Sequence, residues 1–120
     1  MIKLKRVYEK PARSDGIRVL VERLWPRGLR KEGVHIDQWM KEIAPSTELR
    51  KWFGHNPARW EEFEHRYTTE LREHSEELAR LRRLARGAIL TLVYTARDET
   101  HNSAVVLVRV LRARSIAGRS

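Results

Sequence analysis

The stretch AILTLVY, residues 88–94, is a nearly continuous apolar run in which Thr91 is the one polar residue. A strand with one face in water alternates apolar and polar side chains, whereas a strand covered on both faces does not. The run follows Gly87, a residue type that is common at helix ends. We therefore interpret it as a strand buried on both faces, as in a parallel sheet that is covered by helices.

Two earlier stretches also have the pattern of strands. Residues 2–8, IKLKRVY, alternate apolar and basic side chains, which predicts a short strand with one exposed face. Residues 17–24, IRVLVERL, are rich in aliphatic side chains and place Ile17, Val19 and Val21 on one face. They predict a second strand, from whose end the segment RLWPRG leaves.

From about residue 35 to residue 84 the apolar spacing becomes helical. Asp37 can cap a short helix that stops at Pro45. Ser46 can cap the next helix, over residues 47–53. Two short helices are therefore expected after the second strand.

A longer helix is predicted to start at Asn56 and Pro57, because proline is favoured at the first helical position. Its apolar stripe consists of Trp60, Phe63, Tyr67, Leu71, Leu78, Leu81 and Ala85. At about 1.5 Å per residue this helix would reach roughly 40 Å, which is long for a small domain. We therefore expect a kink or break near His74 and Ser75.

The segment SAVVLVRVLRAR, residues 103–114, contains valines that fit a strand, but its spacing favours a helix. Ala104, Leu107, Val108 and Leu111 fall on one stripe. Asn102 or Asp98 can cap this helix. Residues 115–120 are expected to form a frayed tail.

The order of these elements predicts a single α/β domain over residues 1–120, with a small, mainly parallel sheet covered by helices and an ordered core over residues 1–114. A chain of 120 residues is long enough for one hydrophobic core. No apolar run approaches the roughly 18 to 20 residues that span a bilayer, and the N-terminus lacks a signal-peptide pattern. We therefore expect a cytoplasmic protein with no membrane partner.

The composition narrows the chemistry further. The formal net charge is +9, which favours anionic partners. The absence of cysteine excludes disulfides, thiolate nucleophiles and zinc sites of the cysteine type. The five histidines are scattered, without carboxylates at metal-ligand spacing, so no metal and no cofactor is predicted.

The loops at residues 23–28 and 95–102 follow the ends of the second and third predicted strands. In parallel α/β sheets, ligands bind outside the carboxyl ends of the strands. If these two strands are parallel, both loops emerge on the same rim and form the expected ligand site.

Four stretches resemble a known family. They are DGIRVLVERLWPRGL, WMKEIAPSTELRKWFGH, RYTTEL and LTLVYTARDETHNSAVVL, and the resemblance that they carry extends from about residue 2 to residue 112. In this order they are similar to the YeaO-like family of uncharacterised bacterial proteins, domain of unknown function four-eight-eight. The resemblance implies a compact cytoplasmic α/β domain and implies no particular activity.

The candidate ligand-binding residues lie in these shared stretches. They are Arg23, Trp25, Arg27, Gly28, Lys41, Ser46, Arg50, Tyr94, Arg97, Asp98 and Asn102. Arginine offers planar, bidentate donors to phosphate or carboxylate, and a tryptophan can stack on a base or sugar. The sequence therefore predicts binding of a small anionic ligand, phosphate-bearing or nucleotide-like.

Structural explanations of the same residues stay open. The arginines can pair with Glu22, Asp98 or Glu42, and Ser46 can act simply as a helix cap. For hydrolysis, Asp98 or His101 could act as the base, yet the chain has no GxSxG, HExxH or P-loop motif. Catalytic residues, and whether the protein is an enzyme, are therefore left unassigned.

Two alternatives to a small ligand remain. The arginine cluster near the end of the long helix, Arg80, Arg82, Arg83 and Arg86, can serve nucleic-acid binding or a solvated helix face. The tryptophan loop can dock on a protein partner. Within the loop we expect Arg27 to serve the site, and Trp25 and Pro26 to shape it, with Trp25 wedged against Leu24 and the helices.

Overall fold

The computed structural model describes residues 1–113 and contains one four-stranded parallel sheet with the strand order β1-β4-β2-β3. The strands are β1 (Ile2–Arg6), β2 (Ile17–Leu20), β3 (Gln38–Trp39) and β4 (Leu90–Tyr94). All five residues of β4 are buried, and this strand lies between β1 and β2. The predicted α/β class, parallel sheet and doubly covered strand are confirmed.

Strands β1 and β2 end earlier than the sequence predicts. The N–H groups of Val7 and Val21 still bond to the carbonyls of Tyr94 and Val93, at 2.7 and 3.1 Å, and the chain then leaves the sheet. Because β2 ends at Leu20, Glu22 and Arg23 lie at the edge of the sheet and not in a strand.

The predicted helix after Asp37 is wrong. The Asp37 carboxylate accepts the N–H of Arg18 at 2.8 Å, and Gln38 and Trp39 then form β3 beside β2. A short 3-10 turn, η2 (Lys41–Ile43), follows. The apolar spacing that indicates a helix here arises instead because Trp39 and Met40 pack into different parts of the interior.

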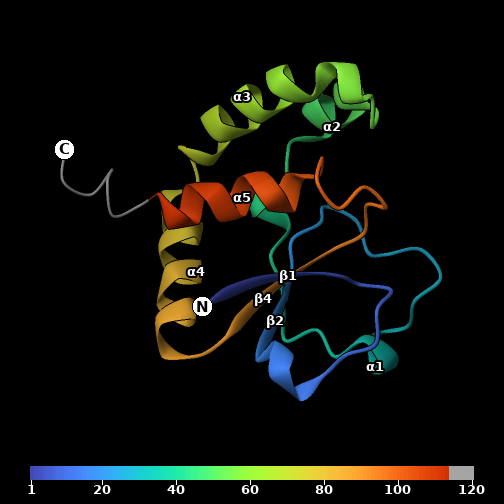
Figure 1. Ribbon diagram of the computed structural model, residues 1–120, viewed down its shortest axis with the longest axis vertical. Helices are drawn as coiled ribbons and strands as arrows, with labels where there is room; N and C mark the ends of the chain where they lie inside the picture. The colour runs from blue at the N-terminus through green and yellow to red at the C-terminus, as the bar shows by residue number, and fades with distance from the viewer. Residues whose placement is uncertain (114–120) are drawn as a thin grey trace.

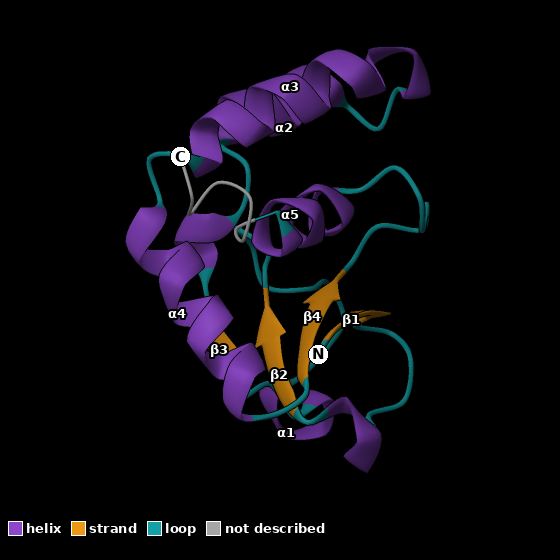
Figure 2. Cartoon of the chain, turned by 60° about the vertical axis from the view of Figure 1, so that its left-hand side comes forward, coloured by secondary structure: helices purple, strands orange, loops and turns teal. Residues whose placement is uncertain are grey.

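The helices α2 (Thr47–Phe53), α3 (Trp60–Leu71), α4 (Ser75–Gly87) and α5 (Ser103–Arg112) lie on one side of the sheet (Figure 1). Helix α5 contacts β1 and β4, and α3 packs on α5 away from the sheet (Figure 2). A 3-10 turn, η3 (Pro57–Arg59), precedes α3. Within residues 1–113, no helix has the length and apolarity needed to cross a membrane.

Two helix starts confirm capping predictions, and a third helix boundary confirms the predicted break. Ser46 Oγ accepts the N–H of Leu49 at 3.1 Å, and Asn102 Oδ1 accepts the N–H of Val105 at 3.0 Å. The long apolar stripe is broken at His74, which separates α3 from α4. The last helix ends at Arg112, two residues before the predicted end, and the expected tail, residues 115–120, lies outside the described residues.

The core has two parts, one on each face of the sheet. The larger part joins the residues of β2 and β4 that face the helices to the inner sides of α2 to α5. The smaller part consists of Val7, Leu20, Val34 and Val93, with Trp25, Leu29, Ile36 and Trp39 packed against them. The second face is covered by the loops after β1 and β2 and by the short helix α1 (Lys31–Val34).

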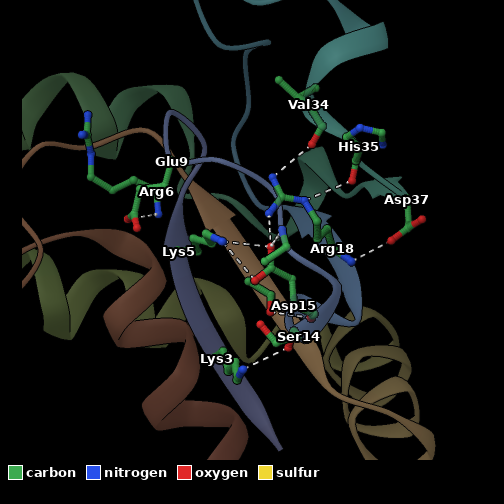
Figure 3. Close-up of polar contacts among 12 residues, drawn as sticks. Lys3, Lys5, Arg6, Glu9, Ser14, Asp15, Arg18, Val34, His35 and Asp37 are labelled. Carbon is green, nitrogen blue, oxygen red and sulfur yellow. Dashed lines mark hydrogen bonds and ion pairs between the residues drawn. The ribbon is translucent and has the colours of Figure 1, made fainter.

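A polar network lies under these loops (Figure 3). The Asp15 carboxylate accepts hydrogen bonds from Arg18 Nη1 at 2.6 Å and from Lys5 Nζ at 3.1 Å, and Asp15 and Arg18 are buried. Arg18 also donates to the carbonyls of Val34 and His35. The basic face of β1, predicted to be exposed, is therefore partly covered, because Lys5 is held by Asp15.

Candidate ligand-binding site

The loops that follow β2 and β4 meet at the carboxyl edge of the sheet. The Thr95 N–H donates to Glu22 Oε2 at 3.0 Å and joins the two loops directly. Strands β2 and β4 are parallel to each other, so their carboxyl ends lie at the same edge of the sheet. Residues at the end of α2 lie beside the two loops. This is the position at which parallel α/β sheets bind ligands.

Three adjoining hollows form a cleft here. The inner one has a volume of about 110 Å³, and the two outer ones have volumes of about 490 and 430 Å³. His55 and Thr95 line all three, and Glu22, Arg23 and Arg50 line both the inner and the larger outer one. We call these three hollows together the rim cleft.

Glu22 lies at the junction of the inner hollow and the larger outer one. Burial raises the pKa of its carboxyl, and the Thr95 N–H and hydroxyl, Arg50 and His55 offset this rise only in part. Sequence reasoning named Glu22 only as an ion-pair partner of the arginines. Its position immediately after a strand, inside a shared motif, is the signal that could have marked it as a site residue.

Arg23 is held by the protein itself. Its Nε and Nη2 donate to the carbonyl oxygens of Pro45 and Ala44 at 3.1 and 2.9 Å. The guanidinium group therefore ties the loop after β2 to the segment before α2. This contact is structural, although its partners are backbone carbonyls and not the carboxylates considered from the sequence.

Trp25 shapes the loop from the side of the sheet that faces away from the helices. Its Nε1 donates to the Leu29 carbonyl at 2.7 Å, and its ring meets that of Trp39 edge-on with centroids 5.4 Å apart. The expected packing of Trp25 against Leu24 and the helices is therefore wrong, and Leu24 is 61% exposed. Lys41 lies over the ring of Trp39, with its Nζ atom 4.2 Å from the ring centroid.

The rest of the tryptophan loop is a tight turn. Pro26 is buried, and its carbonyl accepts the Leu29 N–H at 3.4 Å. Gly28 has φ +82°, a left-handed conformation that side-chain-bearing residues rarely adopt. The Arg27 carbonyl accepts the Tyr8 hydroxyl at 3.2 Å, which fixes the backbone of the turn while the arginine side chain points outward as an exposed group.

Three arginines at the rim cleft are not taken up by the protein. Within residues 1–113, the guanidinium groups of Arg27, Arg50 and Arg97 donate no hydrogen bond and form no ion pair, and all three side chains are exposed. Arg27 and Arg50 line the larger outer hollow, and Arg97 lines the adjacent one. The structure thus brings these predicted residues together around one cleft.

Three other predicted residues serve helix ends and loops. Ser46 Oγ caps α2 and also donates to Glu70 Oε2 at 2.6 Å. Asn102 caps α5 and donates to the Asp98 carbonyl at 2.9 Å. The N–H groups of Thr100 and His101 bond to Asp98 and hold the pKa of its carboxyl well below the usual range.

Tyr94 is part of the core and not of the cleft. It is 3% exposed at the end of β4, where burial raises the pKa of its hydroxyl. Gly28 likewise lines none of the three hollows. Tyr94 therefore packs in the core, and Gly28 allows the tight turn of the tryptophan loop.

His55 is a cleft residue that sequence reasoning did not select. It follows the αL residue Gly54 at the end of α2 and itself has φ +56°, a left-handed conformation that is uncommon outside glycine. The double left-handed turn brings the imidazole to all three hollows. Within the described part of the chain, no group of three histidine or carboxylate side chains could hold a metal ion.

These features define a class of protein, a small parallel α/β domain with a cleft at the carboxyl edge of its sheet. The chain belongs to the DUF488 family, since the family model described as the inactive DUF488-N3 subclade matches residues 1–118. This confirms the resemblance seen in the sequence motifs.

Two curated relatives align with almost the whole chain. The uncharacterized protein YeaO of Escherichia coli strain K12 is 46% identical over 112 residues, which are 93% of this chain and 97% of that protein. The uncharacterized protein Rv3073c of Mycobacterium tuberculosis strain H37Rv is 42% identical over 113 residues, with 94% and 95% covered. No solved structure matches the chain significantly.

The structure separates the roles of two neighbouring loop residues. Trp25→Ala removes a half-buried ring and its hydrogen bond, so we expect it to lower the free energy of unfolding by roughly 2 to 3 kcal/mol, below the roughly 3 to 5 of a fully buried tryptophan. Arg27→Ala removes an exposed, unpaired side chain and should change it by less than about 0.5 kcal/mol. Urea melts of both variants measure the difference, and equal losses would show that Arg27 is a structural residue.

Proposed function

We propose that the rim cleft binds a small phosphate-bearing molecule and that the domain acts by binding without turnover. The observation that carries this proposal is the gathering of Arg27, Arg50 and Arg97 around one cleft, with their guanidinium groups unpaired within residues 1–113. Guanidinium groups match the geometry of phosphate oxygens and form hydrogen bonds that are stronger because both partners are charged.

The cleft also has the shape of a small-molecule site. The inner hollow is lined by Phe53, Phe63, Ala44 and Pro45, while Arg27 lines only the larger outer hollow and Arg50 borders both. A mostly apolar pocket with a few converging polar groups is the usual form of a ligand site. Arg23 and Thr95 hold its walls in place through contacts with the backbone and with Glu22.

Exposed apolar side chains at the outer rim extend this interpretation to nucleotide-like ligands. Tyr8 is 46% and Leu24 61% exposed, and both line the larger outer hollow with Arg27. An aromatic ring beside a phosphate-binding arginine can stack on a base, so a nucleoside monophosphate is the fuller ligand that we propose.

Binding without turnover is supported by two points. The subclade that matches this chain is described as inactive. In addition, the hydroxyl of Ser46 is bonded to Glu70, while His101 is bonded to Asp98, so these groups belong to separate networks and form no nucleophile and base pair.

The nucleic-acid alternative gains no specific support. Arg82 donates to the carbonyls of Val110 and Leu111 at the end of α5, and Arg80 donates to the Gln38 side chain. Part of the predicted basic cluster is therefore used inside the domain. A titration with single-stranded DNA and RNA at about 50 mM salt tests the alternative, because binding through several phosphates weakens steeply as salt rises.

The proposal is tested by isothermal titration with inorganic phosphate and with adenosine 5′-monophosphate. We expect Arg27→Ala and Arg50→Ala each to weaken binding by roughly 10- to 100-fold, because each removes a charge-assisted hydrogen bond. Arg83→Ala is the matched control, since Arg83 is an exposed arginine on α4 that lines none of the hollows of the cleft.

The control separates a built site from general attraction to a basic protein. Loss of affinity in the two cleft variants with none in Arg83→Ala supports the proposal. Equal weakening in all three variants, or no detectable binding by the unaltered protein at millimolar ligand, overturns it.

A further inference from the structure

We propose that Glu22 determines the specificity of the rim cleft, by selecting phosphorylated molecules that carry a hydroxyl or amino donor able to reach its carboxylate. This inference rests on the proposed function, because it assigns the arginines to the phosphate and Glu22 to the rest of the ligand. The observations that carry it are the position of this carboxylate between the inner and outer hollows and its incomplete hydrogen bonding.

Glu22 reaches farther into the rim cleft than Arg27 does. It lines the inner hollow of about 110 Å³ and also the larger outer one, whereas Arg27 lines only the outer one. Arg50 lines both. A ligand whose phosphate lies at Arg27 and Arg50 therefore extends its other end toward Glu22.

The carboxylate retains acceptor capacity for that end of the ligand. A carboxylate has about four lone-pair positions, and the partners within the protein are the N–H and the hydroxyl of Thr95. The loop that holds Glu22 is fixed by Trp39 Nε1, which donates to the Glu22 backbone carbonyl at 2.7 Å. Glu22 is thus a positioned acceptor that opens into a cavity.

The charge of Glu22 affects ligands with and without a donor group in opposite ways. A carboxylate beside a phosphate site repels any ligand that brings only negative charge, and the half-buried position strengthens this repulsion. A ligand with a hydroxyl or ammonium group offsets the repulsion by donating to Glu22. Glu22 therefore weakens binding of plain phosphates and strengthens binding of phosphates with a donor, which is the signature of a specificity residue.

Three small probes test this prediction by isothermal titration. Methyl phosphate has no donor at pH 8, ribose 5-phosphate carries hydroxyl donors, and 2-aminoethyl phosphate carries an ammonium donor. The unaltered protein should bind the two donor-bearing probes roughly 10- to 100-fold more tightly than methyl phosphate, the effect of a hydrogen bond to a charged group. The comparison of hydroxyl with ammonium shows which donor the pocket prefers.

Glu22→Gln is the decisive variant. The Thr95 N–H retains the amide oxygen of the new side chain, so the NH₂ group, a donor, faces the cavity. We expect the donor-bearing probes to lose roughly 10- to 100-fold in affinity, while methyl phosphate binds equally or more tightly. A variant that had merely lost its structure would lose affinity for all three probes, so opposite signs for the probes report specificity.

A pH series on the unaltered protein tests the same point without a substitution. The charged and titratable groups near Glu22 are Arg23 and Arg27 from its own loop, Arg50 from α2, His55 from the turn after α2, and Tyr67 from α3. The measured quantity is the affinity for ribose 5-phosphate divided by that for methyl phosphate. Both ligands share the phosphate, so its own titration largely cancels.

This ratio should fall as the pH is lowered, because burial favours protonation of Glu22, and a protonated Glu22 accepts more weakly and repels phosphate less. Glu22→Gln keeps His55, so a flat ratio in the variant assigns the change to Glu22.

The outcomes distinguish this inference from the proposed function. Equal binding of the three probes by the unaltered protein, or an unchanged preference in Glu22→Gln, overturns the role of Glu22 and leaves phosphate binding in place. Failure of all three probes to bind the unaltered protein overturns the proposed function itself. A preference that is lost in Glu22→Gln and that follows pH as described in the unaltered protein supports both.

Discussion

Asp15→Ala is expected to lower the free energy of unfolding by about 3 to 5 kcal/mol, because it leaves the guanidinium of Arg18 buried without its counter-ion. Asp15 is 4% and Arg18 3% exposed, and Arg18 Nη1 lies 2.6 Å from Asp15 Oδ2. The substitution also removes the acceptor for the Ala12 N–H and for Lys5. Urea denaturation followed by circular dichroism measures the loss.

Two further variants show that the loss arises from the buried charge. Glu73→Ala removes an exposed carboxylate that has no ion pair within the described residues and should change stability by less than about 0.5 kcal/mol. Arg18→Met combined with Asp15→Ala should recover part of the loss, because no uncompensated buried charge then remains. A double variant that is less stable than either single variant would contradict this explanation.

The same network predicts how acid affects stability. Burial alone would raise the pKa of Asp15, but the Ala12 N–H, Lys5 and Arg18 outweigh it and hold the pKa below its usual range. A folded-state pKa below the unfolded one stabilises the protein above about pH 4, and this stabilisation is lost as the pH falls through the folded-state pKa. Below about pH 4 the melting temperature of Asp15→Ala should therefore fall less steeply than that of the unaltered protein.

Local sequence patterns predicted the parts of the fold that local physics decides. The unbroken apolar run of β4 indicated burial on both faces, and Ser46 and Asn102 indicated helix starts that the structure confirms. The break near His74 followed from the length of the apolar stripe. Each of these features depends on residues that are close together in the chain.

Long-range contacts explain what the sequence patterns missed. Gln38 and Trp39 form a strand because β2 offers them an open edge and Arg18 binds Asp37, and neither partner is visible in the local spacing. The polar network around Asp15 was not predicted for the same reason. Seen in one strand alone, the alternating Lys3 and Lys5 look like a solvent-exposed face, whereas in the structure they bond to Ser14 and Asp15.

The loop positions in the sequence predicted where the cleft lies, but only some of the residues that line it. The parallel sheet brings Arg27 and Arg97 to one cleft, as the loop positions implied. Arg23 instead bonds to backbone carbonyls, which no sequence pattern reveals. Glu22 was considered only as an ion-pair partner of the arginines, although its position after a strand could have marked it, and His55 was not selected because a single histidine has no signature until the fold encloses it.

Gly16→Ala is the second substitution with a large expected effect. Gly16 has φ +64° and ψ −132°, a backbone conformation that is essentially confined to glycine. A Cβ atom at this position would lie 2.2 Å from the Ile89 carbonyl oxygen, which accepts the Ile17 N–H at 2.8 Å where β2 begins. Backbone strain of about 1 to 3 kcal/mol and overpacking of about 1 to 3 kcal/mol together predict a loss of about 4 kcal/mol.

Gly33→Ala is the matched control for this substitution. Gly33 lies within α1, and a Cβ there would meet no atom within 4 Å. Alanine is favoured over glycine inside a helix by roughly 0.5 to 1 kcal/mol, so this variant should be as stable as the unaltered protein or slightly more stable. The same glycine-to-alanine change is therefore expected to lower the free energy of unfolding at Gly16 and to leave it unchanged or raise it at Gly33. Paired urea melts of the two variants test the backbone geometry at the start of β2. A similar stability for both variants would show that the close approach of Gly16 to Ile89 is not required for folding.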